Sequence, residues 1–258
     1  MSVKIKSARE IEFMTEAGHI LAKVHSDLGK ELHEGMSTAD IDHLGKEIIC
    51  SYGCIPSFLG YNGYPASICV SVNDEVVHGI PDSRRILKEG DLVSLDAGVI
   101  YKGYHSDAAR TYILGDAPEH VKKLIKVTEQ CFFEGIKYAK EGYHLYDISH
   151  AIGTYAEYFG YGVVKELCGH GIGTKLHEDP QIPNFSMHRR GIKLKAGMTL
   201  AVEPMINLGT ADIRWKPDGW TVVTRDHKPS AHYENTILIT ENEPKILTLL
   251  KESNKGET

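Results

Sequence analysis

Apolar residues recur at helical spacing in four stretches of the chain. Two of them lie early, at residues 7–35 and 37–53, and two lie later, at residues 121–142 and 148–160. The first opens with the capping motif "SARE", and each stretch closes near a glycine. A side-chain cap before the apolar pattern and a glycine after it are typical of α-helices. The pattern therefore predicts a pair of helices in each half of the chain.

Shorter apolar stretches with many small residues follow each predicted helix pair. The segment "LVSLDAGVIYKGYHSDAAR" (92–110) has the pattern of two strands that turn near Lys102 and Gly103. In the second half, "MTLAVEPMI" and "AHYENTILIT" predict further strands. Helices backing one curved antiparallel sheet would bury these apolar faces and leave the open face of the sheet free for a site. The sequence thus predicts an α+β fold.

The two halves also resemble each other in sequence. "EGMSTADIDHLGKEIICSYG" (34–53) is similar to "EGYHLYDISHAIGTYAEYFG" (141–160), and the same offset aligns "LKEGDLVSLD" with "LKAGMTLAVE". Agreement of two blocks on one offset indicates an internal duplication. We therefore expect one domain over residues 1–258, built from related halves at about 5–115 and 116–250.

The duplication aligns acidic residues and histidines of the two halves with each other. Asp96 falls on Glu203, and His78 of "VHGI" falls on His170 of "GHGI". Halves related by a two-fold axis place equivalent residues around that axis. Asp96 and Glu203 are therefore expected to meet near the centre of the molecule.

Four acidic residues fall in the predicted apolar strands. The hairpin would bring Asp96 and Asp107 roughly opposite each other, while Glu203 lies in one later strand and Glu234 begins another. Taken singly, each fits an edge charge or an ion-pair partner better than a functional role. Taken together, buried carboxylates at close range need protonation or cations, because Arg110 is the one basic residue within these strands.

His170 in "CGHGIG" adds an imidazole to this set, although alone it fits a hydrogen-bonded core histidine equally well. A donor set rich in oxygen and poor in nitrogen suits two divalent ions better than one structural zinc, which prefers cysteine and histidine. Arg110 is interpreted as a charge at the sheet edge or behind the carboxylates.

Composition narrows the protein class. With 258 residues and 41% hydrophobic content, the chain can bury a large core. No apolar run is long enough to cross a bilayer, and the start lacks a signal sequence, so a cytoplasmic protein is expected. Five cysteines predict no disulfide framework. The 29 basic against 35 acidic residues argue against a general nucleic-acid binder, and the basic run at 188–195 is interpreted as solvated surface.

The motif blocks resemble those of the type I methionine aminopeptidases, metallopeptidases of family M24 with the creatinase or "pita-bread" fold. "YNGYPASICVSVNDEVVHGIP", "SLDAGVIYKGYHSDAART", "GHGIGTKLHEDPQIPNF", "LAVEPMI" and "HYENTILIT" follow in the order of that family, between about residues 5 and 250. The resemblance implies one catalytic domain with a curved antiparallel sheet and pseudo-two-fold related α/β halves.

The resemblance also implies roles for individual residues. Asp96 would chelate one metal ion, Asp107 and Glu234 would bridge two, and His170 with Glu203 would complete the second. Glu203 would also shuttle protons, with His78 and His177 as unligated catalytic residues that contact the substrate. The implied pocket for a methionine side chain consists of Phe58, Tyr61, Tyr64, Cys69, Leu176 and Trp220. Phe58 departs from many relatives.

The implied reaction is removal of N-terminal methionine from nascent polypeptides, with a small second residue preferred. Hydroxide would form on two divalent ions, for which cobalt, manganese, iron(II) and zinc are all candidates. We expect a monomer that binds no membrane and no specific nucleic acid, while association with the ribosome stays open.

Two alternatives remain. The first is a proline-directed aminopeptidase or dipeptidase of the same fold, which usually carries an extra N-terminal domain for which 258 residues leave no room. The second is a non-catalytic binding relative, which the complete set of ligands and histidines disfavours.

Overall fold

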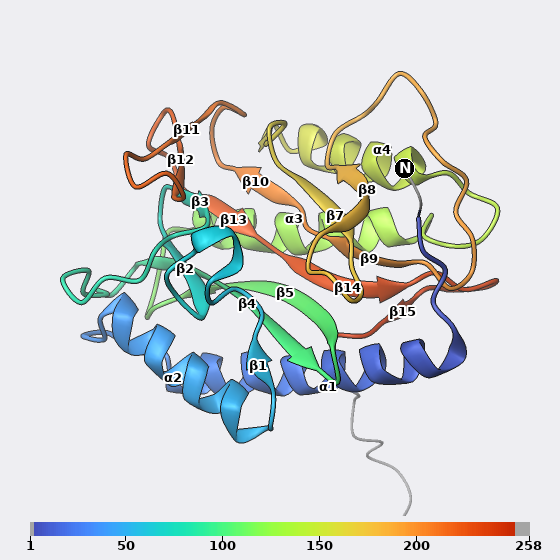
Figure 1. Ribbon diagram of the computed structural model, residues 1–258. Helices are drawn as coiled ribbons and strands as arrows, with labels where there is room; N and C mark the ends of the chain where they lie inside the picture. Colours follow the sequence, from blue (N-terminus) through green and yellow to red (C-terminus); the bar gives the residue numbers. More distant parts are fainter. Residues whose placement is uncertain (1–2, 251–258) are drawn as a thin grey trace, which may run out of the picture.

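The computed structural model describes residues 3–250 and places helices against one side of a large curved sheet (Figure 1). The helices are α1 (Ala8–Glu31), α2 (Thr38–Ser51), η1 (Tyr61–Gly63), α3 (Glu119–Ile136) and α4 (Leu145–Tyr158). A capping box opens both α1 and α2, as the "SARE" motif predicts for the first of them. Within residues 3–250, none of the helices has the length and hydropathy needed to cross a membrane.

The third predicted helix ends earlier than its pattern suggests. Glycine at position 142 led us to expect a helix up to that residue, but α3 stops at Ile136. The following segment pairs instead with two segments that lie outside the sheet strands, because Glu141 N–H donates to Thr240 O at 2.9 Å and Gly142 N–H donates to Leu194 O at 3.4 Å. Tertiary hydrogen bonds therefore override the local helical pattern.

In the described part of the chain, nine antiparallel strands form the central sheet. Its main path runs through β1 (Ile55–Pro56), β4 (Leu92–Tyr101), β5 (Tyr104–Ile113), β14 (Glu234–Leu238), β9 (Thr199–Val202), β7 (Cys168–Gly171) and β8 (Glu178–Pro183), while β2 (Ile68–Val72) pairs with β4 and β15 (Lys245–Ile246) with β14. Strands from both halves of the chain thus share one sheet, with β5 of the first half beside β14 of the second.

Two small sheets extend the structure at one end. One contains β13 (Ser230–His232), β10 (Met205–Asn207) and β6 (Gly162–Val163), and the other contains β11 (Ile213–Trp215), β12 (Val222–Thr224) and β3 (Glu75–Val77). They bring late segments of the chain against the segment around His78, because β3 pairs with β12.

The core has two main parts, one under each helix pair. Leu21 and Leu28 of α1 pack with Leu95 of β4, while Phe132 of α3 packs with Leu200 of β9. These side chains are almost fully buried, and each buried side chain of this size contributes about 1.5–3 kcal/mol of hydrophobic free energy. Because the helices cover one face, the polar site lies on the other. The boundaries of the two predicted halves within one domain stay a prediction, and residues 1–2 and 251–258 of that domain lie outside the described residues.

Candidate metal centre and substrate pocket

The β4–β5 hairpin sets the position of the first two acids. Its two-residue turn consists of Lys102 (φ 49°) and Gly103 (φ 83°), as predicted, and such left-handed pairs form tight hairpin turns. The resulting register pairs Asp96 with Ala109 and Gly98 with Asp107. The two acids share a face as expected. They are diagonal neighbours rather than direct opposites, because the turn pairs Asp96 with the residue two positions after Asp107.

Ala109 also organises the third acid. It pairs with Asp96 on β4 and with Glu234 on β14, so the two carboxylates flank a methyl group on the middle strand. Asp107 lies two residues before Ala109 on β5, so its side chain is on the same face of the sheet. Three acids from three adjacent strands therefore converge on the open face of the sheet, as the sequence predicts.

Glu203 lies beyond a strand rather than within one. β9 ends at Val202, and Pro204 follows Glu203. Proline supplies no N–H for strand pairing and restricts the residue before it, so the chain leaves the sheet here. Asn184 Nδ2 donates to the Glu203 carbonyl at 2.9 Å and anchors this turn. The prediction of a strand at Glu203 was wrong, although its carboxylate still reaches the other acids.

His170 on β7 presents one ring nitrogen to the acids. Its Nδ1 lies 2.9 Å from the Gly171 carbonyl, which can only accept, so Nδ1 carries the hydrogen. The Nε2 lone pair then faces Asp107 Oδ2 at 3.9 Å and Glu203 Oε1 at 3.6 Å. This tautomer and its backbone acceptor are what metal-ligating histidines require.

The spacing and burial of the five residues suit cations. Donor atoms of Asp107, His170 and Glu234 lie within 4.8 Å of one another. Oxygens of Asp96, Asp107 and Glu234 are buried without a hydrogen-bond partner among the described residues. Burial and carboxylate repulsion raise the pKa of Asp107 well above its usual range, and burial is the main cause that raises the pKa of Asp96 to about 7 and of Glu203 to about 8. Cations at this site would offset both the cost of burying the charged carboxylates and the repulsion between them.

Arg110 does not pair with these carboxylate groups. Its guanidinium stacks on the ring of Tyr233, with the central carbon 4.6 Å from the ring centroid. Its donors bind the carbonyls of Ala109, Glu234 and Thr248 and the side-chain oxygen of Asn235. The interpretation of Arg110 as a charge behind the carboxylates agrees with this placement.

A small cavity opens beside the acids. It has a volume of about 140 Å³, below the roughly 300–1,000 Å³ typical of pockets for drug-sized ligands. Its lining includes the five acid and imidazole residues, the two expected catalytic histidines His78 and His177, and every residue expected around a methionine side chain: Phe58, Tyr61, Tyr64, Cys69, Leu176 and Trp220. Asn62 also lines it and was missed, because its position depends on the left-handed turn at η1.

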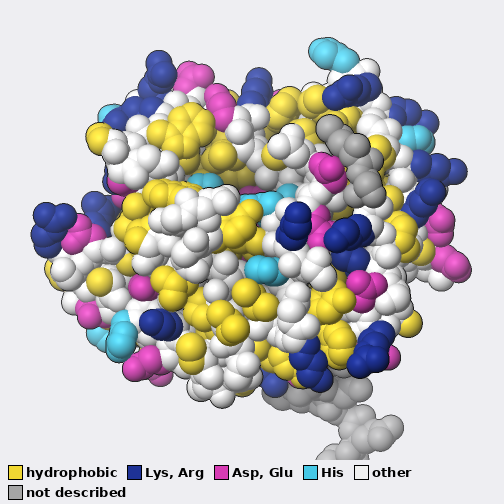
Figure 2. Space-filling view, viewed as in Figure 1, with side chains coloured by type: hydrophobic (Ala, Val, Ile, Leu, Met, Phe, Trp, Pro, Cys, Tyr) yellow, Lys and Arg dark blue, Asp and Glu magenta, His cyan; other side chains and the backbone are white. Residues whose placement is uncertain are grey.

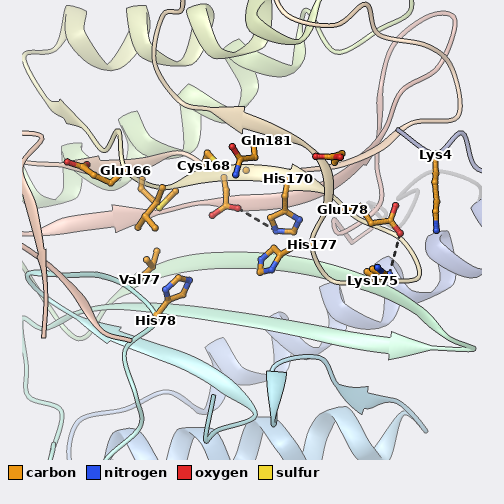
Figure 3. A pocket seen from close by; sticks show the side chains of 15 residues that line it. Lys4, Val77, His78, Glu166, Cys168, His170, Lys175, His177, Glu178 and Gln181 are labelled. Atoms are coloured by element: carbon orange, nitrogen blue, oxygen red, sulfur yellow. Dashed lines mark hydrogen bonds and ion pairs between the residues drawn. The ribbon is translucent and has the colours of Figure 1, made fainter. Parts of the chain in front are cut away.

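The inner cavity meets a larger cleft of about 700 Å³. Both are lined by His78, His170, His177 and Glu203. Histidine side chains are visible at the floor of a hollow across the face shown in Figure 2. In the close view His170 and His177 lie together, with His78 on a neighbouring segment directed toward the same space (Figure 3). The acids thus lie where a one-side-chain pocket joins an open groove.

The two unligated histidines are held in different ways. His177 Nδ1 is hydrogen-bonded to the Tyr61 hydroxyl at 2.7 Å, and its ring packs edge-on against His170 with centroids 4.2 Å apart. His78 has a left-handed backbone (φ 58°), which is uncommon for a non-glycine residue. Trp220 packs edge-on near the His78 ring at 6.3 Å. Both imidazoles therefore border the centre without belonging to its acid cluster.

A buried ion pair fixes the loop that carries His177. Lys6 Nζ lies 2.8 Å from Glu178 Oε2, and the two side chains are 4% and 7% exposed. The backbone N–H of Lys6 donates to Gly197 O, and Glu178 Oε1 accepts from the backbone N–H of Lys175. The N-terminal segment thereby holds the rim of the cleft in place.

Replacement of Lys6 by methionine is expected to destabilise the protein by about 2–3 kcal/mol, because Glu178 would stay buried without its partner. Urea denaturation measures this change. Lys30→Met is the control, since its pair with Asp27 is exposed and should contribute little. Equal stability of the two variants would contradict a structural role for the buried pair.

His232 is a further buried imidazole at the centre that sequence reasoning missed. It forms a second cluster with Glu203 and Glu234, with donor atoms within 4.8 Å of one another. Positions 232 and 234 share a face in an extended chain, so alternation along "AHYENTILIT" could have revealed it. No block used for the resemblance assigns a role to this residue.

Known proteins match the chain over almost its whole length. The model of metallopeptidase family M24 matches residues 12–241. A methionine aminopeptidase of Clostridium acetobutylicum is 51% identical over 245 residues, which cover 95% of this chain and 98% of that protein. The solved structure of a methionine aminopeptidase from Thermotoga maritima has a TM-score of 0.94 and 45% identity, covering 96% of this chain and 100% of that one.

A more distant structure shows the breadth of the fold. A prolidase from Pyrococcus furiosus has a TM-score of 0.74 at 23% identity and covers 96% of this chain and 66% of that one, which indicates a common fold alone. The matches confirm the predicted α+β pita-bread fold, with mixed helices and antiparallel sheet. The extent of the family match and the identity to full-length relatives leave one assignment: this chain belongs to metallopeptidase family M24.

Proposed function

We propose that the protein is a metal-dependent aminopeptidase that removes N-terminal methionine from polypeptides. The supporting observation is the junction of a 140 Å³ pocket, an open cleft and a cluster of four carboxylates with an imidazole. Relatives that match nearly the full chain are named methionine aminopeptidases. A pocket for one side chain beside a hydrolytic centre suits an enzyme that cleaves after the first residue.

Five side chains would hold two divalent ions: Asp96, Asp107, His170, Glu203 and Glu234. Asp107 and Glu234 lie centrally and would serve both ions, while Asp96 and His170 lie toward opposite sides. The bound ions would supply hydroxide at neutral pH by lowering the pKa of water, and would bind the free amine of the peptide. The oxygen-rich set with one imidazole fits manganese, iron(II), cobalt or zinc.

Glu203 is the proposed proton carrier. It lines both the inner cavity and the cleft, so it can reach the attacking water and the leaving amine. Burial raises its pKa to about 8 in the metal-free protein, and neighbouring cations would lower that value toward neutrality. Its carboxylate would take a proton from water and return it to the amine of the second residue.

His78 and His177 are the proposed donors to the substrate. Burial lowers the pKa of His78 to about 4, so its ring is neutral at pH 7 and offers one N–H. The hydrogen bond between the Tyr61 hydroxyl and Nδ1 of His177 orients the second ring. Hydrogen bonds from donors that point at a developing oxyanion become stronger as negative charge builds up in the transition state.

The pocket would select methionine by its narrow shape and its polarizable lining. Cys69 stays a neutral thiol because burial raises its pKa, and the sulfur lies among the aromatic walls of the cavity. An unbranched thioether fits such a polarizable, narrow space. We propose that the preference for a small second residue arises at the mouth of the cleft, and that the enzyme acts as a monomer on nascent chains.

A peptide panel tests this function. Met-Ala-Ser should release methionine, whereas Leu-Ala-Ser and Ala-Pro peptides should be cleaved about ten- to two-hundredfold more slowly, because a misfitting side chain loses roughly 1–3 kcal/mol of transition-state binding. Chromatography of the free amino acid measures the rates with each metal ion in turn. Cleavage mainly before proline would favour a proline-directed enzyme, and absence of any cleavage would favour a non-catalytic relative.

A further inference from the structure

His232 lies at the end of β13 with its backbone tightly fixed. Its N–H donates to Thr111 Oγ1 at 3.0 Å, and the Thr111 hydroxyl donates to its carbonyl at 2.8 Å. The residue is 2% exposed. A single threonine on β5 thus binds both polar groups of the His232 backbone and fixes the point from which the ring projects.

The ring faces Glu203 without making a hydrogen bond. Nε2 lies 3.6 Å from Glu203 Oε2 and 4.0 Å from Glu234 Oε2. The other Glu203 oxygen, Oε1, lies 3.6 Å from Nε2 of His170. Both ring nitrogens of His232 are buried without a partner among the described residues. The Glu203 carboxylate therefore lies between two imidazoles, and His232 lacks the partner that a buried ring normally has.

The two imidazoles differ in what their far nitrogen touches. A ligating histidine almost always donates its other N–H to an acceptor, and His170 does so to the Gly171 carbonyl. Nδ1 of His232 has no acceptor within the described part of the chain. A proton on that Nδ1 would be a buried, unpaired donor, which is rarer in proteins than an unpaired acceptor. The proton of a neutral His232 is better placed on Nε2, toward Glu203.

We propose that His232 is a positioning residue that donates its Nε2–H to Glu203 Oε2 and so directs Oε1 toward His170 and the metal centre. This inference rests on the proposed role of Glu203. Closing the gap from 3.6 Å to hydrogen-bond distance requires a shift of only a few tenths of an ångström. Among the described residues, no hydrogen bond reaches the Glu203 carboxylate; Asn184 binds only the backbone carbonyl of Glu203.

Two substitutions of His232 distinguish the effect of its hydrogen-bond donor from the effect of the space that its side chain fills. His232→Gln keeps an N–H that can reach Oε2, whereas His232→Leu fills the space without a donor. With saturating manganese, His232→Leu should lower kcat for Met-Ala-Ser by about ten- to a hundredfold with KM nearly unchanged, and weaken manganese binding by a similar factor at most. His232→Gln should recover kcat to within about threefold of the wild type.

His25→Leu is the matched control. His25 is also a buried histidine with one ring nitrogen that has no partner within residues 3–250, but it lies on α1 and lines neither cavity. Its replacement should lower thermal stability without the drop in kcat. Equal impairment by His232→Gln and His232→Leu would overturn the proposal.

A measurement on the unaltered protein keeps the proposal testable even if a variant does not fold. In the zinc-loaded, ¹⁵N-histidine-labelled protein, long-range ¹H–¹⁵N correlation spectra report the tautomer of each ring. We expect Nε2–H for His232 and Nδ1–H for His170. An Nδ1–H tautomer with a metal-shifted Nε2 would make His232 a ligand and overturn the positioning role. Loss of peptidase activity in the wild type would instead remove the proposed function, without altering this tautomer readout.

Discussion

Glu203→Gln is expected to abolish turnover while the fold stays intact. Glutamine has the size and one oxygen of glutamate, so the packing around Asn184 and His170 should persist. It cannot take a proton from water or return one to the leaving amine. General acid–base catalysis contributes about 10²–10⁴-fold, and the lost negative charge also weakens the metal centre. We therefore expect kcat to fall by at least about a thousandfold.

The matched control for this variant is Glu166→Gln. Glu166 lines the same cleft but is exposed, and it belongs to neither acid cluster. Its replacement should leave kcat within about twofold, since an exposed charge contributes little. Steady-state assays at saturating metal, with circular dichroism to verify folding, compare the two. Activity of Glu203→Gln within tenfold of the wild type would remove Glu203 from proton transfer.

Removal of the metal ions is expected to cause the largest loss of stability. Ions that bind the folded state alone at a thousand times their Kd contribute about 4 kcal/mol. For a chain of this size, 1 kcal/mol corresponds to roughly 2–4 °C in melting temperature, so chelation should lower it by about 8–15 °C. The physical cause is the cluster of buried carboxylates, which then lose their counter-charges.

This loss should grow as the pH rises. In the metal-free fold, burial raises the pKa of Asp96 to about 7 and of Glu203 to about 8, against about 4 in an unfolded chain. Such groups hold protons more tightly when folded, so their favourable contribution is complete below about pH 4 and is lost as the pH passes 7 to 8. The buried histidines, whose pKa values are lowered, act in the opposite direction below about pH 6.5. The metal-free protein should therefore lose stability between pH 7 and pH 9, where those histidines are neutral in both states, while the loaded protein should change little.

Differential scanning calorimetry at several pH values, with and without manganese, measures both effects. The same melting temperature in the metal-free and loaded protein would contradict the metal site. A metal-free protein that becomes more stable from pH 7 to pH 9 would contradict the burial of protonated carboxylates.

Local signals explain which elements could be predicted from sequence. The capping box at Ser7 and the left-handed turn at Lys102 and Gly103 act within a few residues, so their elements follow from the pattern. The same holds for Asp96 in the mostly apolar β4, for Asp107 across the predicted turn, and for Glu234 just before the apolar residues of β14. The resemblance to family M24 adds His78, His177 and the pocket residues, whose roles the residue pattern alone left open.

Features that depend on distant segments could not be predicted. The end of α3 is set by hydrogen bonds to Thr240 and Leu194, and the pair of Lys6 with Glu178 joins the segment before α1 to the start of β8. Glu203 was expected within a strand because its neighbours are apolar, although Pro204 marked the exit. Register errors of two residues, as for Asp96 and Asp107, keep the same face and so leave the site intact.

Anomalous diffraction from crystals of the manganese-loaded protein tests the central claim most directly. We expect two strong peaks about 3.5–4 Å apart, both among the side chains of Asp96, Asp107, His170, Glu203 and Glu234. His232 Nε2 should lie beyond bonding distance of both peaks. Peaks located away from these five side chains, or saturated crystals without any peak among them, would contradict the proposed two-metal aminopeptidase site.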